Sequence, residues 1–305
     1  MTTIIIIIII IISIYVFISS LGLDTCVRKP LIITCGVDKS VRIWNYLSKS
    51  LELCVIFADA PRSVAFHPSG LYCLIGFPDK LRLCTILMSD IRLIKELPYK
   101  NCIECQFSNG GHLFAAVNVG MINVFNFFTC ELVGTFRGHS AQIRSVFWSL
   151  DDTALVSSSE VGEIYERRHK QTTRSQEYIQ KGCKFTSILS TEDSKIYAVG
   201  DDSTLKEIID GSLNKTVDTG TTLTQLVVSA PPHRMMFAST VTGMYVSKYI
   251  YISHLPLSLS LSLLLYAYII MISIIDIHSA NSSYNPDNPD VISRCNSLLQ
   301  IPFDW

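Results

Sequence analysis

The chain has 305 residues, of which 49% are hydrophobic and only 17% are charged, and its formal net charge at pH 7 is −1. Soluble domains carry about 25% charged residues, so this composition at first suggests a membrane protein. The hydrophobic content excludes a disordered chain, and the near-zero net charge excludes a nucleic-acid binder that relies on high positive charge.

The hydrophobic excess lies at the two ends of the chain. Residues 1–23 contain nine consecutive isoleucines, Ile4–Ile12, and residues 249–277 contain an alternating Leu-Ser tract. All but one of the 25 basic residues and all but four of the 26 acidic residues lie between these ends, in residues 24–248. Each apolar run is long enough for a transmembrane helix, which needs about 20 residues.

The same two runs also look like translated simple-sequence DNA. Iterated AT-rich, CT and TA triplets encode poly-isoleucine, Leu-Ser repeats and Tyr-Ile repeats, and all three occur, at Ile4–Ile12, Leu257–Leu261 and Tyr249–Ile252. An intron that is read through by a faulty gene model has this composition. We therefore predict a gene-model artefact in both segments, with one or two transmembrane helices as the alternative.

Between these ends the sequence repeats about every 41 residues. Successive copies of a short apolar strand that runs into a polar turn are Arg62–Gly70, Ile103–Gly111, Arg144–Asp152 and Phe185–Asp193. A second apolar strand follows each turn, and a third and a fourth complete the period. Four strands in a period of about 40–45 residues are typical of a β-propeller blade.

This register predicts the domain organisation. Residues 24–248 are expected to form an all-β propeller of about five and a half four-stranded blades, which leaves the ring incomplete. Residues 278–305 are expected to be a disordered polar tail. Because the expected ring does not close and both apolar segments interrupt expected strands, we interpret the chain as a fragment of a longer propeller protein.

Four residues carry a family resemblance. Asp38 lies in the turn between the second and third strands of the first blade, with Trp44 six residues later, and Gly138-His139 precedes a later blade. These residues resemble the WD-repeat family, which implies a hydrogen-bond network joining a Gly-His pair, a turn aspartate and a tryptophan. Asp38, Trp44, Gly138 and His139 are therefore assigned to a structural network of this kind, since a buried imidazole needs a partner.

The network is expected to be degenerate in other blades. The blade that begins at His139 has Val161 at the turn position and Arg167 at the tryptophan position. Two other blades have Thr85 and Ile208 at the tryptophan position. These blades are predicted to depend more on the packing of apolar residues.

Longer strings narrow the resemblance to the WD-repeat cilia- and flagella-associated proteins. They are Ser40–Trp44, His67–Tyr72, Asp79–Leu83, Asn109–Asn118 and Thr204–Ile208. The resemblance implies a non-catalytic scaffold in the cytoplasm and axoneme of a cilium or flagellum, with dynein-associated or tubulin-associated protein partners and a role in inner dynein arm assembly or anchoring. The alternatives are a membrane-anchored propeller and a general cytosolic WD-repeat adaptor.

Other candidate sites are few. The basic cluster Arg167, Arg168, Lys170 and Arg174 is a possible contact for an acidic protein partner. Cys102-x-x-Cys105 resembles half of a zinc site, but residues three apart on a strand are expected to face opposite sides. The sequence therefore predicts no catalytic residue, no metal, no cofactor and no nucleic-acid partner.

Overall fold

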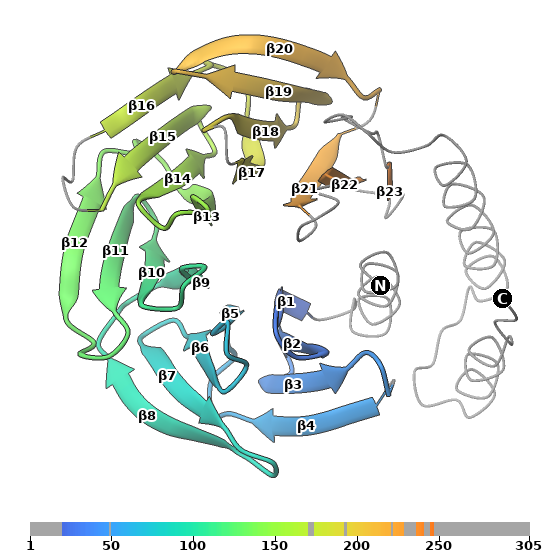
Figure 1. The fold of residues 1–305 in the computed structure, drawn as a ribbon, viewed down its shortest axis with the longest axis vertical. Helices are drawn as coiled ribbons and strands as arrows, with labels where there is room; N and C mark the ends of the chain where they lie inside the picture. The colour runs from blue at the N-terminus through green and yellow to red at the C-terminus, as the bar shows by residue number, and fades with distance from the viewer. Residues whose placement is uncertain are drawn as a thin grey trace, which may run out of the picture. The chain divides into compact units, whose positions relative to one another are not determined.

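The computed structural model describes residues 20–48, 50–169, 174–191, 194–220, 222–228, 236–240 and 245–246. Every regular element in this part of the chain is a β-strand. The strands form five antiparallel sheets of four strands and one sheet of three (Figure 1). Each sheet is one blade, and the blades are numbered below in chain order.

The bounds of the strands follow the predicted period. The first blade consists of β1 (Ser20–Thr25), β2 (Leu31–Gly36), β3 (Ser40–Asn45) and β4 (Ser50–Ile56). The second consists of β5 (Ser63–Phe66), β6 (Tyr72–Gly76), β7 (Leu81–Ile86) and β8 (Ile91–Leu97). The third consists of β9 (Cys102–Phe107), β10 (Leu113–Asn118), β11 (Met121–Asn126) and β12 (Leu132–Arg137).

The fourth blade consists of β13 (Ile143–Trp148), β14 (Ala154–Ser159), β15 (Glu163–Arg168) and β16 (Arg174–Ile179). The fifth consists of β17 (Phe185–Ser190), β18 (Ile196–Gly200), β19 (Thr204–Ile209) and β20 (Ser212–Asp218). The sixth consists of β21 (Leu223–Val228), β22 (Met236–Thr240) and β23 (Tyr245–Val246).

Within each sheet the strands pair in chain order. The first strand of each blade is the innermost and the last is the outermost, and the blades follow one another around a common centre (Figure 1). The prediction of an all-β, open propeller of about five and a half blades is therefore confirmed.

The start of the propeller differs from the predicted boundary. β1 begins at Ser20 and pairs with β2, so the boundary at Asp24 falls inside a strand. The composition-based boundary falls too late in the chain because Leu21 and Leu23, which belong to the strand, also continue the apolar run of the N-terminal segment. The remaining end segments, residues 1–19, 249–277 and 278–305, lie outside the described residues. In the described part of the chain, no helix has the length and apolarity needed to cross a membrane.

The hydrophobic core lies between neighbouring blades. Ile33 of the first blade packs in one cluster with Val64 and Ile75 of the second. Leu74, the neighbour of Ile75 on the same strand, belongs to the next cluster, with Phe114 of the third blade. Successive residues on a strand point to opposite faces, so each sheet is buried on both sides. Each blade therefore depends on its neighbours for burial of its apolar faces.

Polar side chains on the innermost strands also link each blade to the next. At each of the five joints a side chain of one first strand hydrogen-bonds a group on the following first strand. The links join Asp24 to the Phe66 N–H, the Ser63 hydroxyl to the Cys105 thiol, Glu104 to the Val146 N–H, Ser145 to the Ile188 N–H, and Ser187 to the Leu226 N–H. Buried polar groups need such partners.

Two of these links are buried carboxyl groups. Burial raises the pKa of Asp24 to about 6, although N–H donors of Phe66 and Thr25 oppose the shift. Burial also raises the pKa of Glu104 to about 8, against the N–H of Val146. Glu104 is therefore mainly protonated at neutral pH.

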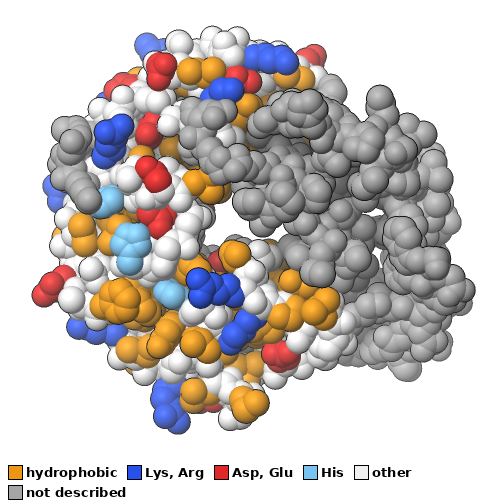
Figure 2. All heavy atoms as spheres, in the orientation of Figure 1, with side chains coloured by type: hydrophobic (Ala, Val, Ile, Leu, Met, Phe, Trp, Pro, Cys, Tyr) orange, Lys and Arg blue, Asp and Glu red, His pale blue; other side chains and the backbone are white. Residues whose placement is uncertain are grey.

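Hydrophobic side chains gather on one face of the second and third blades (Figure 2). Leu71, Met88 and Phe128, which lie in loops of these blades, are exposed. The Phe128 ring packs against Phe127, whose ring in turn contacts the rings of His67 and Tyr72. This cluster gives one face an apolar character.

Candidate functional site

The fourth blade begins at a sharp turn between β12 and β13 that contains Gly138 and His139. Gly138 has a φ of 123°, a conformation that glycine adopts far more readily than other residues. A Cβ atom at this position would also lie 2.5 Å from Nη2 of Arg174. Glycine therefore permits the turn that directs the His139 side chain back onto its own sheet.

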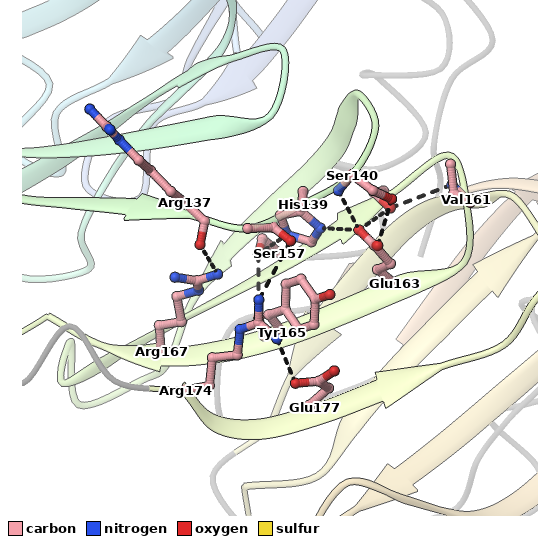
Figure 3. Close-up of polar contacts among 12 residues, drawn as sticks. Arg137, His139, Ser140, Ser157, Val161, Glu163, Tyr165, Arg167, Arg174 and Glu177 are labelled. Carbon is pink, nitrogen blue, oxygen red and sulfur yellow. Dashed lines mark hydrogen bonds and ion pairs between the residues drawn. The ribbon is translucent and has the colours of Figure 1, made fainter.

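The His139 imidazole joins two strands of the fourth blade (Figure 3). Its Nδ1 lies 3.1 Å from Oε2 of Glu163 on β15, and its Nε2 lies 2.7 Å from Oγ of Ser157 on β14. A carboxylate only accepts, so Nδ1 carries the proton and Nε2 accepts from the serine hydroxyl. Burial lowers the pKa of His139 to about 4, although the hydrogen bond to Glu163 opposes this. The ring is therefore neutral at neutral pH.

The Glu163 carboxylate is the centre of this network. Besides His139, it accepts hydrogen bonds from the backbone N–H of Ser140 at 3.0 Å, the Ser140 hydroxyl at 2.7 Å and the Ser159 hydroxyl at 3.3 Å. Burial alone would raise the pKa of Glu163, but the donors on Ser140 and His139 outweigh it and hold the pKa below its usual range. The charged carboxylate is thus compensated by four donors.

Ser157, His139 and Glu163 have the order of a nucleophile, a base and an orienting carboxylate in a hydrolase. Their environment does not suit that chemistry. Ser157 is only 1% exposed, and an imidazole with a pKa of about 4 is a poor base at neutral pH. The arrangement instead fixes the turn, β14 and β15 to one another.

The expectation that this blade depends more on apolar packing than on a polar network needs correction. Val161 does occupy the turn position, but Glu163, two residues later, supplies the carboxylate from the first position of β15. A glutamate side chain is one methylene longer than aspartate, which lets it reach His139 from the strand. A glutamate at the start of the third strand, opposite a serine-rich second strand, was the available signal in the sequence.

Arg167, at the tryptophan position, is 5% exposed. It donates a hydrogen bond to the backbone carbonyl of Arg137 (Figure 3). Its guanidinium carbon lies 5.7 Å from the ring centre of Phe136 and 5.5 Å from that of Tyr165. Arg167 therefore packs inside the blade as a large planar group, as a tryptophan could.

The predicted basic cluster is corrected accordingly. Arg167 is buried and does not form part of a partner surface, because its charge is used within the blade. Arg168 is exposed, and Arg174 lies over the Tyr165 ring at 4.0 Å and pairs with Glu177 at 2.7 Å. Lys170 lies outside the described residues. A contact between an acidic partner and Arg168 or Arg174 stays a prediction.

The first blade holds its turn differently. The Asp38 carboxylate accepts from the Ser40 N–H at 3.2 Å, the Ser40 hydroxyl at 2.7 Å and Arg42 at 2.5 Å. Partial burial opposes the shift, but these groups hold the pKa of Asp38 below its usual range. Trp44 donates from Nε1 to the Thr34 hydroxyl at 3.1 Å. Asp38 and Trp44 thus contribute to one strand pair through separate contacts.

The fifth blade contains a buried cation that the sequence did not reveal. Lys206 is 2% exposed, and its ammonium donates to Thr204 at 2.8 Å and to the carboxylate of Asp202. It also lies 5.4 Å from the ring centre of Phe185. Ile208 at the tryptophan position is fully buried. This blade combines apolar packing with an ion pair at the turn.

The expectation for Cys102 and Cys105 is also corrected. The pairing of β9 with β10 is irregular at Ile103, so that the two thiols face the same side, toward Ser63. The Ser63 hydroxyl lies 3.9 Å from the Cys102 sulfur and donates to the Cys105 sulfur at 3.4 Å. No group of three or more His, Cys, Asp or Glu side chains in the described residues is placed to hold a metal.

Comparison with known proteins agrees with this architecture. The family model described as "WD domain, G-beta repeat" matches residues 18–45 and 130–160. The first match contains Asp38 and Trp44, and the second contains Gly138 and His139. The second match ends at residue 160, before both Val161 and Glu163.

Several relatives share longer stretches. The chain is 44% identical over 223 residues to cilia- and flagella-associated protein 57 of Mus musculus, which covers 73% of this chain and 18% of that protein. It is 48% identical over 145 residues to cilia- and flagella-associated protein 57 A of Tetrahymena thermophila, covering 47% and 11%. It is 26% identical over 144 residues to the 77 kDa echinoderm microtubule-associated protein of Lytechinus variegatus, covering 45% and 22%.

The chain thus spans about a fifth or less of the length of these relatives. Its strand pattern, its WD40 matches and the identity across most of its own length lead to one assignment. The chain belongs to the WD-repeat cilia- and flagella-associated proteins.

Proposed function

We propose that this chain acts as a non-catalytic scaffold in the axoneme of a cilium or flagellum, where it supports the assembly or anchoring of inner dynein arms. The observation that carries the proposal is that the side chains with reactive groups in the fourth blade hydrogen-bond within the fold. His139, Ser157 and Glu163 are buried and bond to one another, so they stiffen a blade instead of meeting a substrate. Rigid blades that present loops suit binding of other proteins.

The relatives supply the cellular setting of the proposal. Two are named for cilia and flagella and one for microtubules, which supports a ciliary location and a microtubule-associated setting. Partners associated with dynein or tubulin are part of the proposal. Catalysis forms no part of this proposal.

The test is localisation of the tagged full chain in a ciliated cell. We expect the tag along the axoneme, and we expect it to remain there after detergent removes the membrane. Depletion of the protein should reduce inner-arm dynein in isolated axonemes and leave outer-arm dynein unchanged. Absence of the tag from the axoneme contradicts the proposed location, and unchanged inner arms after depletion contradict the proposed role.

We also propose that the apolar runs outside the described residues are translated introns. Sequencing of the mature transcript tests this directly. Loss of the codons for Ile4–Ile12 and for Leu257–Leu261 is expected. If both tracts are retained, the membrane-anchored alternative becomes the better proposal, and carbonate extraction of the full chain tests it.

A further inference from the structure

The loops of the propeller fall into two sets that lie on opposite faces. Because the strands of each blade alternate in direction, turns from second to third strands and connections from one blade to the next leave the same face. This face, termed the joint face, comprises residues 37–39, 57–62, 77–80, 98–101, 119–120, 138–142, 160–162, 180–184, 201–203, 219–220 and 222, together with Arg137, the last residue of β12. The remaining loops form the opposite face, termed the hairpin face.

The joint face carries basic side chains that lack acidic partners. Six exposed ones lie in its loops, and no carboxylate of the described residues pairs with any of them. They are Lys39, Arg62, Lys100, Arg137, Lys181 and Lys184. Arg62 donates to the side-chain oxygen of Asn101, which is neutral, so its charge is not compensated. The Arg137 side chain extends away from the His139 network (Figure 3).

The carboxylates of the same loops are largely compensated within the fold. Asp38 pairs with Arg42, Asp59 and Asp79 both pair with Lys80 at 3.3 Å, Glu160 pairs with Arg144, and Asp202 pairs with Lys206. Asp201 accepts the backbone N–H of Lys184 at 2.8 Å. A neutral N–H does not cancel the charge of Asp201, and Lys80 alone serves both Asp59 and Asp79, but the six unpaired cations outnumber these uncompensated carboxylates and remain available to a ligand.

The hairpin face differs in chemistry. Its loops expose Leu71, Met88 and Phe128, together with the carboxylates of Asp90 and Glu131. The exposed cations Arg28 and Arg168 also lie on this face, and Arg28 is close enough to His67 of the ring cluster to lower its pKa. On the joint face, by contrast, Tyr99 is buried.

We propose that the joint face binds a glutamate-rich segment of a partner protein, an inference that rests on the proposed scaffold function. The cations come from separate blades, from the first to the fifth, so they suit an extended acidic chain better than a single compact anion. Attraction between such a chain and an array of uncompensated cations increases both association rate and affinity. The aromatic residues in the joint-face loops, Phe57, Phe77 and Tyr99, are half-buried or buried, so this face offers bases no exposed ring to stack on, which favours an acidic peptide over single-stranded nucleic acid.

The test uses the full chain and a fluorescein-labelled glutamate peptide of about twelve residues, with binding followed by fluorescence anisotropy. The variant K39Q/K100Q/K181Q removes three joint-face charges. The control R92Q/K95Q/K215Q removes three exposed charges from the outer strands β8 and β20. We expect affinity to fall about tenfold or more for the first variant and less than about twofold for the second.

Equal effects of the two variants, or no binding by the wild type, overturn the proposal. A carbodiimide cross-link between the peptide and the wild-type chain gives a second readout that does not depend on any variant. Cross-links are expected at Lys100 and Lys181, and cross-links mainly at Lys95 and Lys215 contradict the assignment.

Two further outcomes separate the possibilities. An oligonucleotide of the same length that binds as tightly as the peptide, with the same loss in the joint-face variant, makes the surface a general polyanion site and overturns the peptide assignment. If the chain reaches the axoneme but does not bind the peptide, the proposed function stands and this inference fails. If it binds the peptide but does not reach the axoneme, the proposed function fails and the peptide site stands.

Discussion

The fourth and first blades hold the same pair of strands together in different ways. In the fourth, the Glu163 side chain is 10% exposed and collects four hydrogen bonds from a histidine and two serines. In the first, the Asp38 side chain is 36% exposed and bonds Ser40 and Arg42, which lie close to it in sequence. The difference shows that burial determines how much stability is lost when a hydrogen-bond partner is removed. A buried donor without its acceptor cannot form a replacement hydrogen bond with water.

The largest expected effect comes from removing the carboxylate of the fourth blade. Glu163→Ala leaves the buried donors of His139 and Ser159, and the two donors of the more exposed Ser140, without their acceptor. We expect the free energy of unfolding to fall by about 3 kcal/mol, measured by urea denaturation of the full chain.

The matched control for that variant is Glu160→Ala in the same turn. Glu160 pairs with Arg144, whose side chain is 51% exposed, so the loss should stay below about 1 kcal/mol. Equal losses for the two variants contradict the distinction between buried and exposed carboxylates.

Acid should also separate the two blades. Folded His139 takes up a proton near pH 4, whereas an unfolded histidine does so near pH 6.5. Its contribution to stability is therefore complete above about pH 6.5 and is lost as the pH falls toward 4. By pH 5 the loss is about 2 kcal/mol, measured as the urea midpoint of the wild type relative to that of His139→Asn. Parallel pH profiles for the two proteins exclude this role for His139.

The joint between the third and fourth blades should respond in the opposite direction. Glu104 keeps its proton up to about pH 8 in the folded chain, but an unfolded glutamate loses it near pH 4.5. The stability it contributes is complete below about pH 4.5 and is lost as the pH rises to 8. We expect a loss of about 2 kcal/mol between pH 6 and 8, and Glu104→Gln should abolish this slope because an amide still accepts from Val146. If the unfolding free energy of the variant still falls as the pH rises, a group other than Glu104 causes the pH dependence.

The period of about 41 residues was sufficient to predict the strands. Copies such as Arg144–Asp152 and Phe185–Asp193 mark the same position in successive blades, and β13 and β17 begin within a residue of the starts of these copies. The hydrophobic pattern fixes these features because each sheet buries both faces.

The polar contacts could not be read in the same way. Glu163 takes over from a missing turn aspartate because its longer side chain reaches across the register, and Arg167 replaces a tryptophan by packing its planar group against rings. The Cys102–Cys105 contact depends on an irregularity at Ile103. Such replacements keep the shape and the hydrogen bonds of the site but change the residue type at the expected position, so a residue pattern does not detect them.

The smallest expected effect concerns the hydrogen bond between Trp44 and Thr34 in the first blade. Trp44→Phe keeps most of the ring but removes the donor to the Thr34 hydroxyl, and Thr34→Val removes the acceptor at nearly constant volume. A double-mutant cycle of unfolding free energies should give a coupling of about 1 kcal/mol.

This coupling decides whether the first blade depends on Trp44 for its hydrogen bond or only for its ring. A coupling near zero means that the indole contributes by packing alone, whereas Arg167 at the equivalent position of the fourth blade also donates a hydrogen bond to the Arg137 carbonyl. In that case the strand pair of the first blade is held at its turn by Asp38 and its near neighbours. The two blades would then share a planar side chain at this position and differ in the hydrogen bond that Arg167 donates and in how deeply their carboxylates are buried.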